Sequence, residues 1–576
     1  RVAWVAGMFA RATLLRAPAA GLALGLLVLL AFLSPAEAAS TPASRWRYRS
    51  NADLAAAMDA LHAGPCSGMS SLVSIGTSVK GTEIRVLEVS ADPGRTQAKP
   101  SFLFLGNMHG DEPVGRELIL RLAELICVAA SASGDADTKN ADGVITVVEQ
   151  GDEHFHEAAR SLATTSRLFF VPSINPDGFE NRARNNARGV DLNRDWPDQF
   201  VSFATGGTDE GSGGSTTKGS GGNNEGATTS THGDSTTSIT FGSSTVLSET
   251  GGGWMADLPH KRQPETAALM KLSRTLNATA GLNFHEGAVV ANYPWDAKDG
   301  STKRSVYAPA PDDATFKRLA SAYANGHPQM HHSKEFPGGI TNGAQWYPLW
   351  GGMQDWHYLQ TQTLDITIEV NDEKWPKEGE LGKIWREHVG GIFACALMAT
   401  RGAVKGFVRD AASNEALPTA VLKIEGVDIA FAPNALGFFA RPVSGNSEKD
   451  AGKNFAVTVT ASADGYTSVT ETVSVHQVEG GEVFFALRKG SGGGGGNFGS
   501  SRDDDGLEDD LFGSPTPTRR DPATVRGLAA TVGGPHRHPE TTWGAAAFVV
   551  LAVAATVRRR RARLGRGRGV ARVEGV

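Results

Sequence analysis

The chain has 576 residues, of which 40% are hydrophobic and 7% aromatic, so it is long enough to contain more than one folded unit. Its 56 basic and 62 acidic residues give a net charge of −6, which argues against a protein that mainly binds nucleic acid. Its three cysteines include no Cys-x-x-Cys pair, which excludes a disulfide-built scaffold and a cysteine-ligated zinc cluster.

The first 38 residues have the pattern of a secretory signal peptide. Arg11 and Arg16 precede a leucine-rich run over residues 20–33, and an Ala-Glu-Ala sequence ending at Ala38 favours cleavage after that residue. An uncleaved N-terminal membrane anchor is the alternative, but the apolar run is short for a span. We therefore expect residues 1–38 to be removed.

Strand-like and helical patterns alternate over residues 45–402. Apolar runs rich in β-branched and aromatic residues predict strands, and apolar residues three or four apart predict helices. The predicted strands are 82–89, 101–105, 167–171 and 366–370, and the predicted helices are 115–130 and 264–275. Such alternation over this length predicts a layered α/β domain with a mostly buried sheet.

One stretch inside this region differs in composition. Residues 203–253 are mainly Gly, Ser, Thr and Asn, with almost no aliphatic side chains. Such a stretch cannot bury enough apolar surface to offset the entropy of ordering it. We expect a disordered insertion that leaves the domain around it intact.

Residues 403–488 have a different periodicity. Short runs of alternating apolar and polar residues predict strands at 404–408, 420–424, 455–460 and 483–487. Their spacing is that of a sandwich, so we expect a small all-β module.

The C-terminal residues are predicted to attach the folded part to a membrane. Residues 489–540 combine a glycine run, an acidic patch and Pro-rich sequence, which is typical of a flexible linker. Residues 541–557 form an apolar, uncharged segment, and the arginine-rich tail at 558–576 would face the cytosol. The segment is short for a span, so a buried helix in a small C-terminal module is the alternative. We favour a single-pass protein whose folded part lies outside the cytosol.

Candidate metal ligands follow the predicted strands of the first region. His109 and Glu112 lie just beyond the strand at 101–105, and His285 ends another apolar run. In open α/β sheets, ligands bind beyond the carboxyl ends of the strands. Two histidines and one glutamate can hold a catalytic zinc with an open position for water. Taken alone, a His-x-x-Glu pair is a weak signal, because most such pairs are a surface histidine near a carboxylate at a helix start.

Several longer motifs recur in one order along the chain. They are Gly106–Glu112, Asn175–Glu180, Arg184–Asn186, Gly189–Arg194, Asn292–Asp296, Gly351–Asp355 and Ile366–Glu369. Together they resemble the zinc metallocarboxypeptidases of the M14 family, in particular the regulatory branch that contains carboxypeptidases D, E, M and N. The resemblance covers about residues 45–488. It implies a mixed-sheet α/β catalytic domain followed by a transthyretin-like β-sandwich, acting on the C-termini of secreted or luminal peptides and proteins.

The resemblance implies a role for each residue that matches a family motif. His109, Glu112 and His285 match the ligands of one Zn²⁺. Glu369 matches the general base that takes a proton from the zinc-bound water. Arg184 matches the arginine that stabilises the developing oxyanion.

The resemblance also implies a substrate site. Asn193 and Arg194 match the pair that holds the substrate's terminal carboxylate, and Tyr347 matches a tyrosine that closes over the substrate. Asp296 and Gln354 match pocket residues of the branch specific for C-terminal Lys or Arg. The sequence Ala308-Pro309-Ala310 stands where that branch carries a pocket serine, so specificity could be looser here.

Each of these residues also has a structural interpretation. Arg184 and Arg194 belong to an arginine-rich loop that could simply be solvated, and Glu369 could be an edge-strand charge. Tyr347 could pack against neighbouring tryptophans, and Asp296 and Gln354 could be loop or turn residues. The joint register of the motifs favours the functional interpretation.

Two other functions stay open. One is a catalytically silent binding module of the same fold, although no ligand or base is missing. The other is a zinc amidohydrolase that acts on acylated amino acids. The signal peptide disfavours a cytosolic tail-trimming enzyme. A secreted protein would permit a Cys66–Cys127 bridge and an N-glycan at Asn277, and we expect no inhibitory pro-segment after Ala38.

Overall fold

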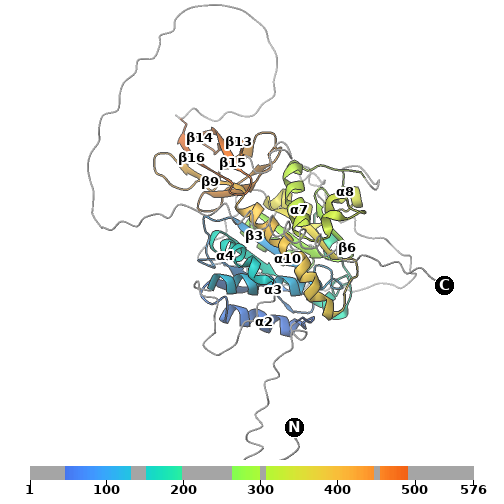
Figure 1. The fold of residues 1–576 in the computed structure, drawn as a ribbon. Helices are drawn as coiled ribbons and strands as arrows, with labels where there is room; N and C mark the ends of the chain where they lie inside the picture. Colours follow the sequence, from blue (N-terminus) through green and yellow to red (C-terminus); the bar gives the residue numbers. More distant parts are fainter. Residues whose placement is uncertain (1–45, 132–150, 198–261, 299–305, 446–453, 491–576) are drawn as a thin grey trace, which may run out of the picture.

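A computed structural model describes residues 46–131, 151–197, 262–298, 306–445 and 454–490 (Figure 1). The predicted signal peptide (1–38), insertion (203–253), membrane segment (541–557) and tail (558–576) lie outside these residues, as does the predicted linker after Gly490. Within the described part of the chain, no helix has both the length and the apolar character needed to cross a bilayer.

A mixed sheet forms the centre of the first region. In the described residues its strands are β1 (Ser70–Thr77), β2 (Glu83–Val89), β3 (Ser101–Gly106), β4 (Arg167–Val171), β5 (Ala280–His285), β6 (Ala288–Tyr293), β7 (Ile340–Asn342) and β8 (Leu364–Asn371). They lie side by side in the order β1-β2-β4-β3-β5-β8-β6-β7. Strands β4, β3, β5 and β8 run parallel to one another. β2 pairs antiparallel with β4 and β6 pairs antiparallel with β8, while β1 pairs antiparallel with β2 and β7 pairs parallel with β6. The four predicted strands are confirmed as β2, β3, β4 and β8.

Helices cover both faces of this sheet. The described α-helices are α2 (Asn51–Ala63), α3 (Val114–Ser131), α4 (His156–Thr165), α5 (Pro176–Asn181), α6 (Pro264–Leu276), α7 (Asp313–Gly326), α8 (Gly343–Trp346), α9 (Met353–Thr361) and α10 (Glu378–Thr400). Figure 1 shows α3, α4, α7 and α10 in front of the sheet. The two predicted helices are confirmed as α3 and α6.

Strand β3 shows why the sheet is buried on both faces. Phe102 and Phe104 belong to the core beneath α3 and α10, whereas Leu103 and Leu105 belong to the core beneath α6 and α9. Successive side chains of a strand point to opposite faces, so a strand covered on both sides is apolar throughout. This fully apolar strand ends directly at the loop that carries the candidate ligands.

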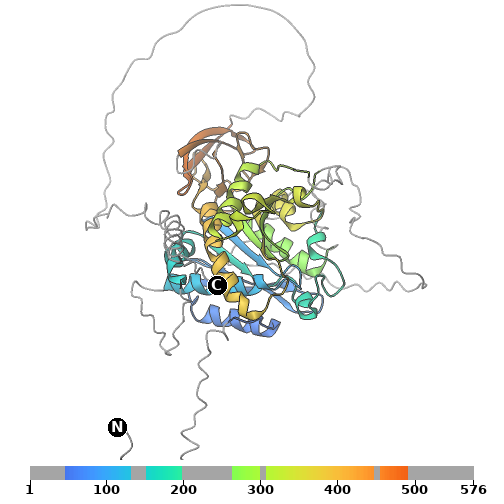
Figure 2. The same cartoon turned by 45° about the vertical axis from the view of Figure 1, so that its right-hand side comes forward.

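The second region is an all-β sandwich. Its strands are β9 (Ala403–Asp410), β10 (Val421–Ile424), β11 (Ala430–Phe431), β12 (Phe438–Pro442), β13 (Asn454–Ser462), β14 (Tyr466–Thr467), β15 (Val469–His476) and β16 (Gly481–Lys489). They form two four-stranded sheets, β11-β10-β13-β15 and β12-β9-β16-β14, around one apolar core. The sandwich packs at one end of the α/β domain (Figures 1 and 2), where α10 contacts β12 and β9. Its likeness to transthyretin stays a prediction.

Cys66 and Cys127 form a disulfide, with their Cα atoms 4.9 Å apart. The bridge ties the segment after α2 to α3. The two residues are 61 positions apart, so the sequence alone could not establish this pairing. Cys395 on α10 is a buried free thiol.

The structure also brings together the two ends of the segment that contains the predicted insertion. Trp196 donates its backbone N–H to the carbonyl of Gly351, and Gln263 donates its backbone N–H to Asp195 Oδ2 at 2.8 Å. Both flanks are therefore anchored by contacts that do not involve residues 203–253.

Deletion of residues 203–253 should leave the domain folded, because its flanks already meet and closing a long surface loop costs little entropy. We expect an unfolding midpoint within about 4 °C of that of the intact chain, and an unchanged rate of peptide cleavage. Calorimetry and a peptide assay on both proteins measure this. Loss of cooperative unfolding on deletion would show that the segment is structural.

Candidate metal centre and substrate pocket

The candidate site lies where three neighbouring parallel strands end. The loop after β3 carries His109 and Glu112, β5 ends at His285, and β8 carries Glu369 near its end. The register between β5 and β8 pairs His285 directly with Glu369. Residues far apart in sequence thus converge at the carboxyl edge of the sheet, as expected for an open α/β fold.

The loop after β3 has little conformational freedom. Asn107 adopts a left-handed conformation, φ 57°, and its side-chain amide donates to the carbonyl of His109 at 2.9 Å. A Cβ at Gly110 would lie 2.0 Å from the backbone of Gly178, so only glycine fits there. These constraints fix the direction in which His109 and Glu112 leave the loop.

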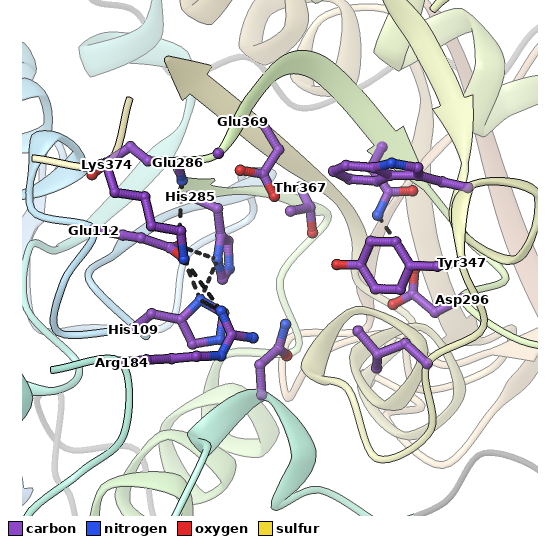
Figure 3. Close-up of a pocket in the computed structure, with 15 residues that line it drawn as sticks. His109, Glu112, Arg184, His285, Glu286, Asp296, Tyr347, Thr367, Glu369 and Lys374 are labelled. Atoms are coloured by element: carbon purple, nitrogen blue, oxygen red, sulfur yellow. Dashed lines mark hydrogen bonds and ion pairs between the residues drawn. The ribbon is translucent and has the colours of Figure 1, made fainter. Parts of the chain in front are cut away.

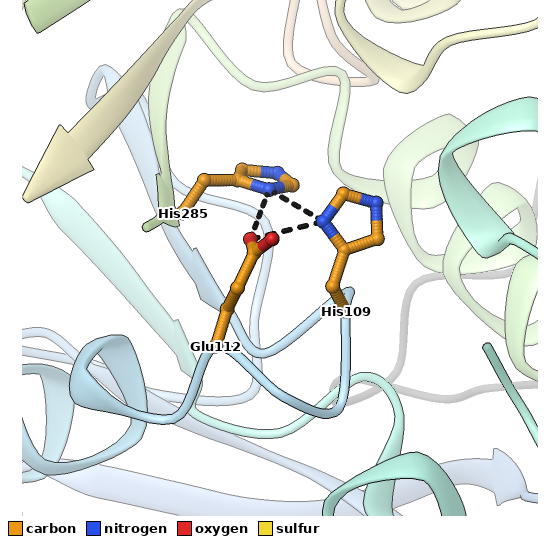
Figure 4. Close-up of side chains that lie close together, drawn as sticks. All are labelled: His109, Glu112 and His285. Carbon is orange, nitrogen blue, oxygen red and sulfur yellow. Dashed lines mark hydrogen bonds and ion pairs between the residues drawn. The ribbon is translucent and has the colours of Figure 1, made fainter. Parts of the chain in front are cut away.

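Three donor atoms face one point in the site (Figure 4). His109 Nδ1 and His285 Nδ1 are 3.1 Å apart, and each lies 2.9 Å from Glu112 Oε2. All three side chains are buried. Zinc–ligand bonds of about 2.0–2.2 Å place neighbouring tetrahedral donors roughly 3.3 Å apart, so this spacing fits a zinc ion. No other group of three such residues within the described ranges could hold a metal.

The second nitrogen of each ring supports this interpretation. His109 Nε2 lies 3.2 Å from Asp191 Oδ1, so it carries the proton and Nδ1 presents its lone pair, with Arg184 Nη1 3.2 Å away. His285 Nε2 lies 2.8 Å from Asn283 Nδ2, and the buried Oδ1 of the same amide has no partner among the described residues. Exchanging the oxygen and nitrogen of this amide gives Oδ1 a partner: Asn283 would then accept the Nε2 proton, and His285 Nδ1 would present its lone pair. Outer contacts of this kind orient histidines for metal binding.

The two oxygens of Glu112 face different partners. Oε2 points to the histidines, whereas Oε1 accepts from Lys374 Nζ at 2.6 Å and from Arg184 Nη1 at 3.4 Å. Burial alone would raise the pKa of Glu112, but His109 and His285 hold it well below its usual value. Glu112 is therefore a carboxylate that presents one oxygen to the metal position.

Glu369 faces the same space without contacting the histidines (Figure 3). It is buried, and its Oε2 has no hydrogen-bond partner among the residues that the structure describes. Burial, followed by the charge of Glu112, raises the pKa of Glu369 to about 8, while His109 and Lys374 oppose the shift. A carboxylate with a pKa near neutrality can accept and return a proton.

A second buried acid lies across the pocket. Asp296 accepts from Gln354 Nε2 at 3.2 Å, and burial raises its pKa to about 6. A Cβ at Gly343 would lie 2.0 Å from Asp296 Oδ1, and one at Gly352 would lie 3.3 Å from Oδ2. The absence of side chains at these glycines leaves room for the carboxylate at the pocket wall.

The other predicted substrate residues lie around this pocket. Tyr347 and Asn193 line it together with Asp296 and Glu369, and Arg184 reaches it from the metal side. Arg194 is not among its lining residues, because its guanidinium donates to the carbonyl of Asn193 at 2.9 Å. Gln354 is not a lining residue either, but it bonds two residues that are, Asp296 and Thr367.

Sequence reasoning missed three residues that support the site. Asn283 precedes His285 by two positions on one strand, and side chains two apart share a face. The sequence could therefore have indicated that Asn283 lies beside His285. Asp191 lay within a recognised motif, but nothing in the sequence linked it to His109. Lys374 follows β8 in a loop, and its reach to Glu112 could not be predicted.

Comparisons with known proteins point to one family. Residues 54–391 match the family profile described as zinc carboxypeptidase. Carboxypeptidase SOL1 of Arabidopsis thaliana is 35% identical over 427 residues, covering 74% of this chain and 69% of that protein. The catalytic chain of Mus musculus carboxypeptidase N is 30% identical over 495 residues, covering 81% of this chain and 90% of that protein. Carboxypeptidase D of Anas platyrhynchos is 31% identical over 439 residues, 73% of this chain but 25% of that protein.

The purified protein should bind one Zn²⁺ per chain, and Asp191→Ala should weaken zinc binding about 10–100-fold, because His109 loses the acceptor that orients its ring. Competition with a chromogenic chelator measures the affinity. Asp195→Ala is the matched control, since this neighbouring carboxylate bonds Gln263 rather than a ligand. Equal zinc affinity in both variants would contradict the assigned orientation of His109.

Proposed function

This chain belongs to the zinc carboxypeptidase family, and we propose that it removes C-terminal Lys or Arg residues from peptides and proteins in the secretory pathway or outside the cell. It is a metallocarboxypeptidase, a hydrolase of a zinc-dependent family, as its motifs indicated. The observation that carries the proposed specificity is Asp296, a buried carboxylate that lines the same pocket as the candidate metal ligands and Glu369.

We assign the metal to His109, Glu112 and His285. A bound Zn²⁺ supplies an acidified water and polarises the scissile carbonyl. Glu369 accepts a proton from the attacking water and returns it to the leaving amine, which its raised pKa allows. Arg184 carries a positive charge beside this position, held by a bond from its Nε to Asp191 Oδ2 at 2.9 Å, and stabilises the developing oxyanion.

Asn193, Arg194 and Tyr347 position the substrate in this proposal. Asn193 lines the pocket, and its Oδ1 accepts from the backbone of Met353, which leaves its amide hydrogens for the substrate's terminal carboxylate. Arg194 adds positive charge next to Asn193 and needs a change of rotamer to contact the substrate directly. Tyr347 lies opposite the metal ligands (Figure 3), where it can cover a bound peptide end.

Asp296 suits a cationic side chain. Burial raises the pKa of Asp296, and the hydrogen bond from Asn292 and the charge of Arg194 oppose this shift only in part. A lysine or arginine side chain would supply the missing charge, and a hydrogen bond to a charged group contributes about 1.5–3 kcal/mol. A catalytically silent binding module is disfavoured because all three candidate ligands converge with Glu369 in one pocket.

Several features support a location in the secretory pathway or outside the cell. The Cys66–Cys127 disulfide is typical of an oxidising compartment, and residues 1–38 have a signal-peptide pattern. Asn277 is partly exposed at the end of α6 and can carry the predicted glycan. Attachment through residues 541–557 stays a prediction, since they lie outside the described residues.

Glu369→Gln should retain zinc and lose at least about 10²-fold in kcat, because the amide cannot accept the water's proton. Metal analysis and kcat for a peptide ending in arginine measure the two properties. Chelation should abolish activity in the unaltered enzyme, and added zinc should restore it. Normal turnover in the Glu369→Gln enzyme would remove Glu369 from its role.

The preference for basic residues should depend on pH. The ratio of kcat/KM for a peptide ending in Arg to that for one ending in Phe should fall about tenfold from pH 7.5 to 5, because Asp296 becomes neutral below its pKa of about 6. The ratio cancels the titration of Glu369, which both substrates share.

Asp296→Ala should lower this ratio at pH 7.5 by about 10–100-fold and remove its pH dependence. Asp428→Asn, which changes an exposed carboxylate of the sandwich, is the charge control. Cleavage of Phe as fast as Arg, or an unchanged ratio in the Asp296→Ala enzyme, would refute the pocket assignment.

A further inference from the structure

We propose that the β-sandwich helps to shape the specificity pocket through helix α9, and that Arg441 of the sandwich is a positioning residue for Asp296. This inference rests on the proposed function, in which Asp296 receives the substrate's basic side chain. It concerns contacts remote from the metal centre, which link two regions that are separate in sequence.

The C-terminal end of α9 is held by the sandwich. Gln362, which follows the helix in a left-handed conformation with φ 58°, accepts at its carbonyl from Arg441 Nη1 at 2.8 Å. Its side-chain oxygen accepts from the backbone of Ala432 at 3.0 Å. Two sandwich residues therefore fix the residue at which the helix ends.

Arg441 also reaches α9 indirectly, through an ion pair with Asp312, the buried residue that precedes α7 and bonds Tyr358 of α9. Its Nη2 contacts Asp312 Oδ2, and the same oxygen accepts from the Tyr358 hydroxyl at 2.8 Å. The backbone of Asp312 in turn donates to that hydroxyl at 3.1 Å. All three side chains are almost completely buried. Removing Arg441 would leave a buried carboxylate without its counter-charge, so this part of α9 would have to adjust.

The N-terminal end of the same helix holds the pocket. Gln354 donates to Asp296 Oδ1 at 3.2 Å, and the Asp355 carboxylate accepts from the backbone of Asp296 at 3.0 Å. Met353 donates its backbone N–H to Asn193 Oδ1 at 3.0 Å. The helix has nine residues, about 13 Å, and is short and regular enough to transmit a shift of one end to the other.

Arg441 is not the only attachment of the sandwich. Arg318 on α7 donates to the carbonyls of Val443 and Gln477, and Asn434 donates to the carbonyl of Gln97 at 3.0 Å. These contacts do not involve α9. The sandwich should therefore stay attached when Arg441 is replaced, and Arg318 offers a control that crosses the same boundary.

The test compares Arg441→Met with Arg318→Met in the full chain. Arg441→Met should raise KM for a peptide ending in Arg about tenfold, with kcat and zinc content within about twofold of the unaltered enzyme. The rise for a peptide ending in Phe should be clearly smaller, because both peptides use Asn193 but only the first uses Asp296. Arg318→Met should lower the unfolding midpoint without changing either KM. Arg441→Lys should recover part of the loss, because it keeps a charge beside Asp312.

Equal KM effects in the two methionine variants, or an unchanged KM in Arg441→Met, would overturn the inference. If Arg441→Met fails to fold, Gln362→Gly provides the test, since glycine suits the backbone at φ 58° but loses the bond to Ala432. A smaller rise of KM is then expected, and no rise overturns the inference. If the unaltered enzyme prefers another C-terminal residue, the proposed role of Asp296 in binding Lys or Arg is wrong, whatever the effect of Arg441→Met. KM for that preferred substrate then decides the role of Arg441.

Discussion

The site depends on one electrostatic constraint: three electron-rich atoms lie within 3.1 Å of one another in a buried place. The Nδ1 atoms of His109 and His285 and the Oε2 atom of Glu112 repel each other unless a cation lies between them. Arg184 and Lys374 offset part of this repulsion from the side, whereas Asp191 and Asn283 take up the outer nitrogens of the rings and keep the three atoms facing one another. The candidate ligands are thus held in place by the protein itself, and a bound cation would supply the missing charge.

The sheet provides the rigidity that such an arrangement needs. Strands β3, β5 and β8 are adjacent and parallel, and their register pairs His285 with Glu369. A shift of one residue along β8 would turn Glu369 to the opposite face. The shift is costly because Ile366, Ile368 and Val370, which alternate with Glu369 along β8, would leave the apolar core on the other face of the strand. The position of the base therefore follows from the packing of the whole domain.

Local patterns allowed part of this structure to be predicted. Apolar strands, the pair of His109 and Glu112 three residues apart, and the alternating strands of the sandwich are all features of short stretches. The structure confirms the elements they predicted and brings the two ligands together with His285. The disulfide between Cys66 and Cys127 and the contact of Lys374 with Glu112 depend on how distant segments pack. The pattern of residues within a short stretch does not indicate which distant segments come into contact.

Two buried acids with raised pKa values illustrate how one physical effect can serve two purposes. Glu369 and Asp296 are both almost fully buried, and burial is the largest cause of the shift in each. Their surroundings differ. Glu369 lies beside Glu112 and the metal position, so its proton affinity is set by groups of the enzyme and suits proton transfer. Asp296 lies beside the amides of Asn292 and Gln354, away from the metal ligands, and the charge of Arg194 offsets its desolvation only in part. We therefore propose that a basic side chain of the substrate is the partner that best compensates its charge. The same desolvation that makes an unpaired carboxylate unfavourable then favours a substrate with a basic end over one without.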